Sequence, residues 1–141
     1  MLDSVLIIGM HRLVKDLDHK TMEIVTKYDL TFPQFMVLEA LFYREGLSIG
    51  EIKEKILSSD GTIPVIINNL EKLGFIERQK DKKDQRKSLI FLTQEGKEKI
   101  TQVLPENKKM IEQQFAIYSQ EEKKFLASLL QKYRKLHKGG K

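Results

Sequence analysis

Residues 60–74 carry amide, hydroxyl and small apolar side chains at spacings that suit contact with the edges of DNA bases. Isoleucine and leucine recur there at helical spacing and should share one buried face, formed by Ile63, Ile66, Ile67, Leu70 and Leu73. The opposite face would carry Gly61, Thr62, Val65, Asn68, Asn69 and Lys72. An asparagine amide can pair with adenine through two hydrogen bonds, and valine methyl groups can contact the thymine methyl group. This face therefore favours the reading of DNA bases.

The start of this predicted helix offers groups that suit a phosphate. Ser58, Ser59 and Thr62 carry hydroxyl groups, and the first backbone amides of a helix attract anions. Pro64 has no amide hydrogen and must therefore lie in the first turn, which places the helix start between Asp60 and Thr62. We expect this end of the helix to contact the DNA backbone.

A dense cluster of cationic side chains follows the helix. Residues 78–87 contain six cationic and two acidic residues, and the centre of the cluster holds Lys82, Lys83, Asp84 and Arg86. Arginine on a protruding tip suits the negative potential of a narrow minor groove. A charged tip alone is usually just solvated, and two adjacent asparagines alone are equally typical of a polar helix surface. Because both features follow one capped turn, their combination favours DNA binding.

Gly74 should end the helix. Residues 75–80 and 87–92, on either side of the cationic tip, are typical of strands. A helix followed by a basic β-hairpin is a winged helix-turn-helix. Upstream, Ser48 and Glu51 form a capping box that should open the first helix of this motif, and residues 57–59 form its turn. Another capping box, Thr31 with Gln34, should open a helix whose buried face holds Phe35, Leu38, Leu41 and Phe42.

Long helices are predicted on both sides of this motif. Residues 2–28 should form the first, and residues 94–118 the fifth, either as one helix bent at Pro105 or as two helices that meet there. Ser119 and Glu122 form a third capping box before a last helix. Surplus apolar surface at the two ends predicts pairing with a second copy. It is formed by Leu2, Leu6, Ile7, Met10, Phe115, Ile117, Phe125, Leu129 and Tyr133.

The composition excludes several classes of protein. The 141 residues include no cysteine, which excludes disulfides, thiolate metal sites and thiol redox switches. Three scattered histidines offer no convergent reactive set, so the sequence predicts neither an enzyme nor a metal or cofactor site. No run of 18 apolar residues occurs, and the N-terminus lacks the cationic segment of a secretory signal, which favours a cytoplasmic protein without a membrane anchor. The net charge of +5 mildly favours an anionic partner.

Three short patterns stand out along the chain: LEKLGFIER at residues 70–78, D-x-R at 84–86, and L-T-x-x-G at 92–96. Together with the order of the helices and strands, they resemble the MarR/SlyA family of regulators. The resemblance implies one domain over residues 1–141, mainly α with a small β-hairpin wing (α+β). In it, residues 31–93 form a winged helix-turn-helix lobe, and residues 1–30 and 94–141 form a helical dimerisation region. It also implies that Arg86 enters the minor groove, positioned by Asp84.

The resemblance further implies a sequence-specific transcriptional regulator, a repressor that binds a palindromic operator in double-stranded DNA as a homodimer. Members of the family commonly bind aromatic effectors between the dimer region and the DNA-binding lobe, which implies release by a small aromatic molecule. Pro64 and Val65 stand where the family often has a polar pair, which changes the base contacts expected there. The alternative is a winged helix that binds only other proteins, which would show no salt-sensitive affinity for DNA.

Overall fold

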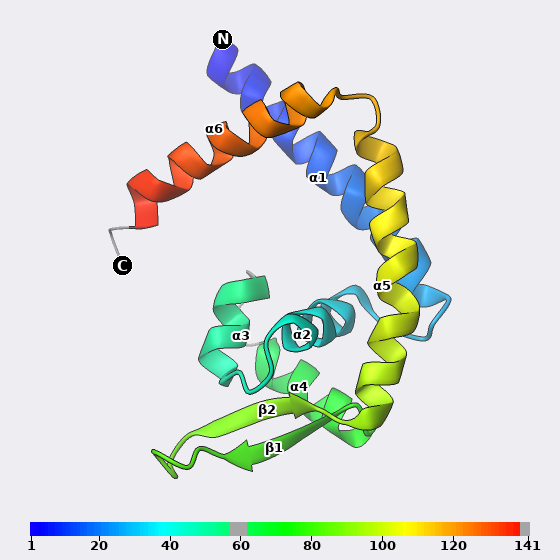
Figure 1. The fold of residues 1–141 in the computed structure, drawn as a ribbon, viewed down its shortest axis with the longest axis vertical. Helices are drawn as coiled ribbons and strands as arrows, with labels where there is room; N and C mark the ends of the chain where they lie inside the picture. The colour runs from blue at the N-terminus through cyan, green and yellow to red at the C-terminus, as the bar shows by residue number, and fades with distance from the viewer. Residues whose placement is uncertain (57–61, 139–141) are drawn as a thin grey trace. The chain divides into compact units, whose positions relative to one another are not determined.

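The computed structural model describes residues 1–56 and 62–138. The chain forms two compact units that divide after Asn107. The first contains α1 (Leu2–Thr26), α2 (Phe32–Tyr43), α3 (Ile49–Ile56), α4 (Ile63–Lys72), β1 (Ile76–Lys80), β2 (Ser88–Leu92) and the first part of α5 (Gln94–Phe115) (Figure 1). The second contains the rest of α5 and α6 (Gln120–Lys138). The predicted fold class, mainly α with a small hairpin, is confirmed.

Reciprocal hydrogen bonds cap three of these helices where the sequence predicts them. The Thr31 hydroxyl accepts from the Gln34 amide at 3.2 Å, and the Gln34 side chain accepts from the Thr31 amide at 3.0 Å. The same exchange links Ser48 with Glu51 ahead of α3. A third exchange links the pair ahead of α6, Ser119 and Glu122. Each cap satisfies amides that the first helical turn leaves without a partner, which stabilises a helix by about 1 kcal/mol.

The core of the first unit lies between α2, α3, α4 and β2. Fully buried aliphatic side chains from all four elements meet there, including Val37, Leu38, Leu41, Ile52, Ile63, Ile67, Leu70 and Ile90. Two predictions of burial were wrong, because Leu73 is 53% and Phe42 39% exposed. Leu73 follows the last residue of α4, and the chain turns toward β1 at Gly74, whose φ is +83°. Phe42 lies in the last turn of α2, where its ring meets that of Tyr43 edge on.

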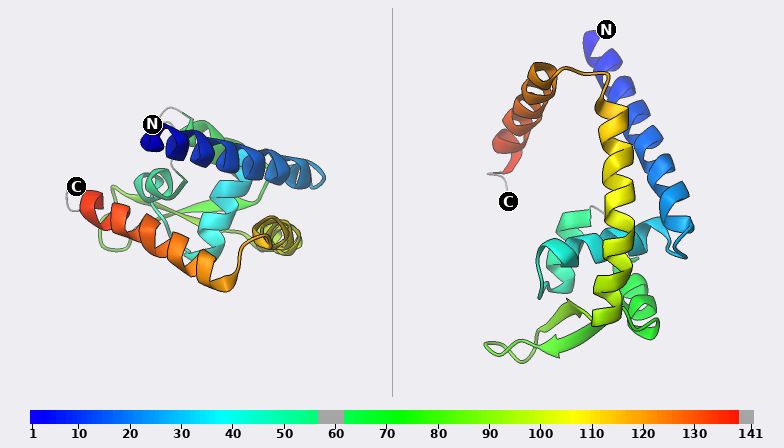
Figure 2. Two further views of the ribbon diagram at one scale, coloured as in Figure 1. Left: turned by 90° about the horizontal axis from the view of Figure 1, so that it is seen from above. Right: turned by 45° about the vertical axis from the view of Figure 1, so that its right-hand side comes forward.

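The hairpin is joined to the helices by a backbone bridge that the sequence did not predict. β1 and β2 pair antiparallel, with Ile76 opposite Leu92 and Lys80 opposite Ser88. On the other side of β2, Leu47 and Ile90 exchange two backbone hydrogen bonds of 3.2 and 2.8 Å. The hairpin projects from the helices, and its tip is the end far from α5 (Figures 1 and 2). Its base is thus held while its tip extends.

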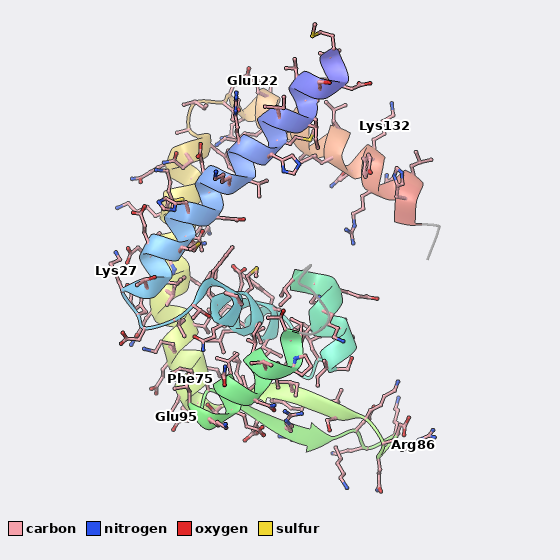
Figure 3. The ribbon with its side chains drawn as sticks, turned by 180° about the vertical axis from the view of Figure 1, so that it is seen from behind. Lys27, Phe75, Arg86, Glu95, Glu122 and Lys132 are labelled. Atoms are coloured by element: carbon pink, nitrogen blue, oxygen red, sulfur yellow. The ribbon has the colours of Figure 1, made fainter. Side chains whose placement is uncertain are left out.

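The first turn of α5 packs directly against backbone at the start of β1. The Thr93 amide donates to the Phe75 carbonyl at 3.0 Å, and the Thr93 hydroxyl donates to the Gly74 carbonyl at 2.6 Å. The same hydroxyl accepts from the Gly96 amide at 3.0 Å. A Cβ atom at Gly96 would lie 2.0 Å from the Phe75 oxygen. Figure 3 labels Phe75 and Glu95 at this junction. The L-T-x-x-G pattern is therefore a joint between β2 and α5.

Polar side chains connect the end of α1 with α5. The Thr21 hydroxyl donates to the Asn107 amide oxygen at 2.9 Å, and both residues are buried. Glu106 pairs with Lys27 and accepts from the Tyr28 hydroxyl at 2.8 Å. The hydrogen bond from Lys27, and to a smaller extent that from Tyr28, lowers the pKa of the Glu106 carboxyl. α5 continues through Pro105 as a single helix and not as two helices that meet there, while the bend expected at Pro105 stays a prediction.

Candidate nucleic-acid interface

α4 presents the predicted polar face to solvent. Its isoleucines and Leu70 are buried, whereas Val65 is 56% exposed. The other members of the predicted face that the structure describes are exposed as well, namely Thr62, Asn68, Asn69 and Lys72, and so is Pro64. Gly61, also predicted on this face, lies outside the described residues, as do Ser58 and Ser59. The division into a buried and an exposed face is thus confirmed for every described member except Leu73, while the roles of these residues in DNA binding remain predictions.

Pro64 sets the start of α4 as expected. Thr62 occupies the N-cap position, and Pro64 lies in the first turn. The first amides of a helix have no intrahelical partner, so the missing N–H of proline removes no bond there. The Ile66 amide makes a helical bond to the Thr62 carbonyl at 3.1 Å. The observed start agrees with the start predicted from Pro64.

Two aspartates order the backbone at the tip of the hairpin. The Asp81 carboxylate accepts from the Lys83 amide at 3.0 Å, and the Asp84 carboxylate accepts from the Arg86 amide at 3.1 Å. Backbone bonds of 3.0 Å from Asp81 to Lys87 and from Lys87 to Asp84 close the loop. The acidic residues of the cluster therefore shape the loop, while the side chains of Lys82, Lys83 and Arg86 remain exposed.

Arg86 is paired with Asp84 at this tip and is still almost fully exposed. Its side chain is 92% exposed, and its Nε lies 3.3 Å from an Asp84 carboxylate oxygen. Figure 3 shows it at the end of the hairpin, away from the helices. An exposed ion pair of this kind contributes only about 0–1 kcal/mol to stability. The bond uses Nε, so the terminal nitrogens of the exposed guanidinium keep their N–H donors for a contact with DNA.

Arg78 in β1, one of the six cationic residues of the cluster, is bonded to the exposed face of α4. Its Nε donates to the Glu71 carboxylate at 3.1 Å, and its Nη2 donates to the Asn68 amide oxygen. Its side chain is 33% exposed, far less than that of Arg86. These bonds tie the exposed face of α4 to the first strand of the wing. The opposite charges of Glu71 and Arg78 on either side of the Gly74 turn were the signal available in the sequence.

A surface hollow between α2 and α3 was not predicted. Its volume is about 610 Å³, and it is lined by Met36, Glu39, Ala40, Tyr43, Lys55 and Ile56. Partial burial raises the pKa of the Glu39 carboxyl. The lining thus combines aromatic and aliphatic surface with one acidic and one basic group.

Comparison with known proteins places this geometry in a family. A family model described as the transcriptional regulator SarA/Rot matches residues 20–103, which include the whole of α4 and the hairpin. The chain belongs to the SarA/Rot family of transcriptional regulators. This SarA/Rot-family chain is 32% identical over 96 residues to the HTH-type transcriptional regulator TtmR of Methylorubrum extorquens, which covers 68% of the chain and 49% of TtmR. It spans about half the length of the curated relatives that it matches.

Solved structures of other proteins superpose on this chain over most of its length. A MarR-like transcription regulator from Bacillus cereus superposes with a TM-score of 0.81 at 23% identity, over 96% of this chain and 97% of that one. An organohalide-sensing transcriptional regulator, solved with 2,4-dichlorophenol bound, superposes with a TM-score of 0.80 at 20% identity, over 96% and 80% of the two chains. The predicted MarR-like winged helix is confirmed. The SarA/Rot-family chain thus shares its family model and its fold with transcriptional regulators.

Within residues 1–56 and 62–138, no group of three or more His, Cys, Asp or Glu side chains could hold a metal ion. No helix in that part of the chain is long and apolar enough to cross a membrane.

Proposed function

We propose that this SarA/Rot-family regulator binds a palindromic operator as a homodimer and represses transcription until a small aromatic effector releases it. The observation that carries the proposal is the exposed polar face of α4, tied through Arg78 to a wing whose tip holds exposed cations. A helix of this kind fits a major groove, while an arginine on the wing fits the adjacent minor groove. The proposed DNA contacts are Ser58, Ser59, Thr62, Pro64, Val65, Asn68, Asn69, Lys72, Lys82, Lys83, Asp84 and Arg86.

Exposed apolar side chains support the homodimer. α1 leaves Leu2, Val5, Leu6, Ile7, Ile8 and Met10 between 47% and 70% exposed. α6 leaves Phe125, Leu126, Leu129, Leu130, Tyr133 and Leu136 between 38% and 78% exposed. Contiguous apolar surface of this kind usually marks an interface. We therefore assign residues 31–93 to DNA binding, and residues 1–30 and 94–141 to pairing of two copies.

The hollow between α2 and α3 supports the effector. Tyr43 and Met36 would contact an aromatic ring, and Glu39 or Lys55 would bond a phenolic hydroxyl. The organohalide-sensing regulator with the same fold holds 2,4-dichlorophenol. A repressor of this kind would occupy its operator and leave it when the effector binds. We place that action in the cytoplasm. If a small aromatic molecule is the effector, addition of a phenol should release bound duplex from the protein.

The proposal is tested by selecting bound duplexes from a random library. The expected result is an inverted repeat whose half-sites lie about one DNA turn apart, roughly 34 Å. Asn69→Ala should relax the preference at particular positions rather than weaken binding to all duplexes. A single unrepeated half-site would contradict the twofold operator. The absence of any salt-sensitive affinity would favour a winged helix that binds only proteins.

Arg86→Ala is expected to weaken operator binding by about 1–3 kcal/mol, because an arginine in a groove contributes through both charge and geometry. Lys82→Ala is its matched comparison on the same tip. If Lys82 meets only phosphate, its loss should weaken all duplexes alike and reduce the salt dependence by about one unit. Fluorescence anisotropy at several salt concentrations separates the two effects. Unchanged affinity for a folded Arg86→Ala protein would contradict the wing assignment.

A further inference from the structure

We propose that Arg78 determines base specificity without touching DNA, by turning the Asn68 amide so that it presents its NH2 group to the major groove. The inference rests on the proposed function, in which α4 reads bases. A guanidinium group has only donors, so the atom of the Asn68 amide that faces Arg78 must be its oxygen. The two atoms of an amide point in different directions, and the nitrogen is therefore directed away from Arg78.

Arg78 is held firmly enough to impose this orientation. It is the third residue of β1, where it pairs with Ile90, the strand residue that also bridges to Leu47. Its Nε is bonded to Glu71, which lies three residues after Asn68 and hence beside it on the surface of α4. The planar guanidinium is thus held at Nε by a carboxylate while its Nη2 meets the amide. Lysine could not reproduce this fork.

The orientation changes what Asn68 can read. Pairing with adenine requires both the oxygen and the nitrogen of the amide to face the same base edge. An Asn68 whose oxygen is turned to Arg78 has only N–H donors for the base, which suits the acceptors of guanine, O6 and N7, or O4 of thymine. Among the described residues, none is hydrogen-bonded to the side-chain amide of Asn69. The two adjacent asparagines therefore read different bases, and only Asn69 keeps both atoms for adenine.

The proposal also separates Arg78 from the phosphate-binding cations. Two of its nitrogens are already engaged within the protein, and its side chain is one-third exposed. A phosphate contact would depend on its charge, which Arg78→Lys retains. A positioning contact would depend on its geometry, which Arg78→Lys destroys. The substitution therefore distinguishes the two roles.

The test compares selected-site profiles of the wild type, Arg78→Lys, Asn68→Ala and the double variant. At the base pair whose preference Asn68→Ala abolishes, the wild type should prefer guanine or thymine. Arg78→Lys should shift that preference toward adenine by roughly tenfold, because the freed amide can then make both hydrogen bonds. The salt dependence should stay unchanged. The double variant should match Asn68→Ala, because Arg78 acts only through Asn68.

Nuclear magnetic resonance of the protein without DNA supplies a second measurement. The side-chain NH2 signals of Asn68 should shift on Arg78→Lys, while those of Asn69 should stay in place. An unshifted Asn68 signal would overturn the inference, as would an Arg78→Lys base profile identical to that of the wild type. Either result would leave the proposed function intact. A wild type that selects no sequence at all would overturn both.

Discussion

Replacing Gly96 by alanine is expected to lower the free energy of unfolding by about 3 kcal/mol or more. The added Cβ would lie 2.0 Å from the Phe75 carbonyl oxygen. Because that oxygen belongs to the backbone, no change of side-chain rotamer can remove the clash. That oxygen also accepts the Thr93 amide, so moving it breaks the joint between β2 and α5. The substitution therefore loosens the hairpin as well as the start of α5.

Gly50→Ala is the matched control for this prediction. Gly50 lies in α3, and a Cβ there would meet only the Ser48 hydroxyl, at an ordinary distance of 3.9 Å. Alanine should thus stabilise α3 by about 0.5–1 kcal/mol, because it loses less backbone freedom than glycine on folding. Urea unfolding followed by circular dichroism at one protein concentration measures both variants. A Gly96→Ala protein as stable as the wild type would show that α5 does not pack on Phe75.

Leu129→Asp is expected to convert the proposed homodimer to monomers and to lower operator affinity by about 100-fold or more. Leu129 is 46% exposed and lies within the apolar face of α6, so a carboxylate there costs the single chain little. In a dimer the same carboxylate would be buried at the interface without a partner, which is strongly unfavourable. A monomer holds one half-site, and loss of the second linked site typically removes a factor of about 10²–10⁴. Deletion of residues 1–10 should act in the same direction.

Gln131→Asp adds the same charge on the opposite, polar side of α6 and should leave both properties unchanged. Sedimentation at micromolar protein concentration and anisotropy with the selected operator measure association and affinity on the same samples. The interface assignment fails if Leu129→Asp yields a folded monomer that binds the palindrome as tightly as the wild type. In that case the apolar ends would serve another purpose.

Local patterns in the sequence were enough to predict the elements and the outward face of α4. A helical repeat reports burial on one side, and a capping box involves residues only three positions apart, so both can be found without the fold. The faces of α4, the three capping boxes, the place of Pro64 and the basic hairpin follow from such patterns. The two errors of burial, Leu73 and Phe42, fall at helix ends, where a repeat no longer tells which way the chain turns.

Contacts between distant residues were decided only by the tertiary structure. Thr21 and Asn107 are 86 positions apart, and no repeat or motif links them. The bridge from Leu47 to Ile90, the approach of Gly96 to Phe75, the hollow beside Glu39 and the bond from Arg78 to Asn68 likewise depend on how the chain returns on itself. The sequence by itself determined that asparagines would be exposed on α4. Only the fold decided that a strand residue would turn one of them, because that orientation comes from a hydrogen bond across the Gly74 turn.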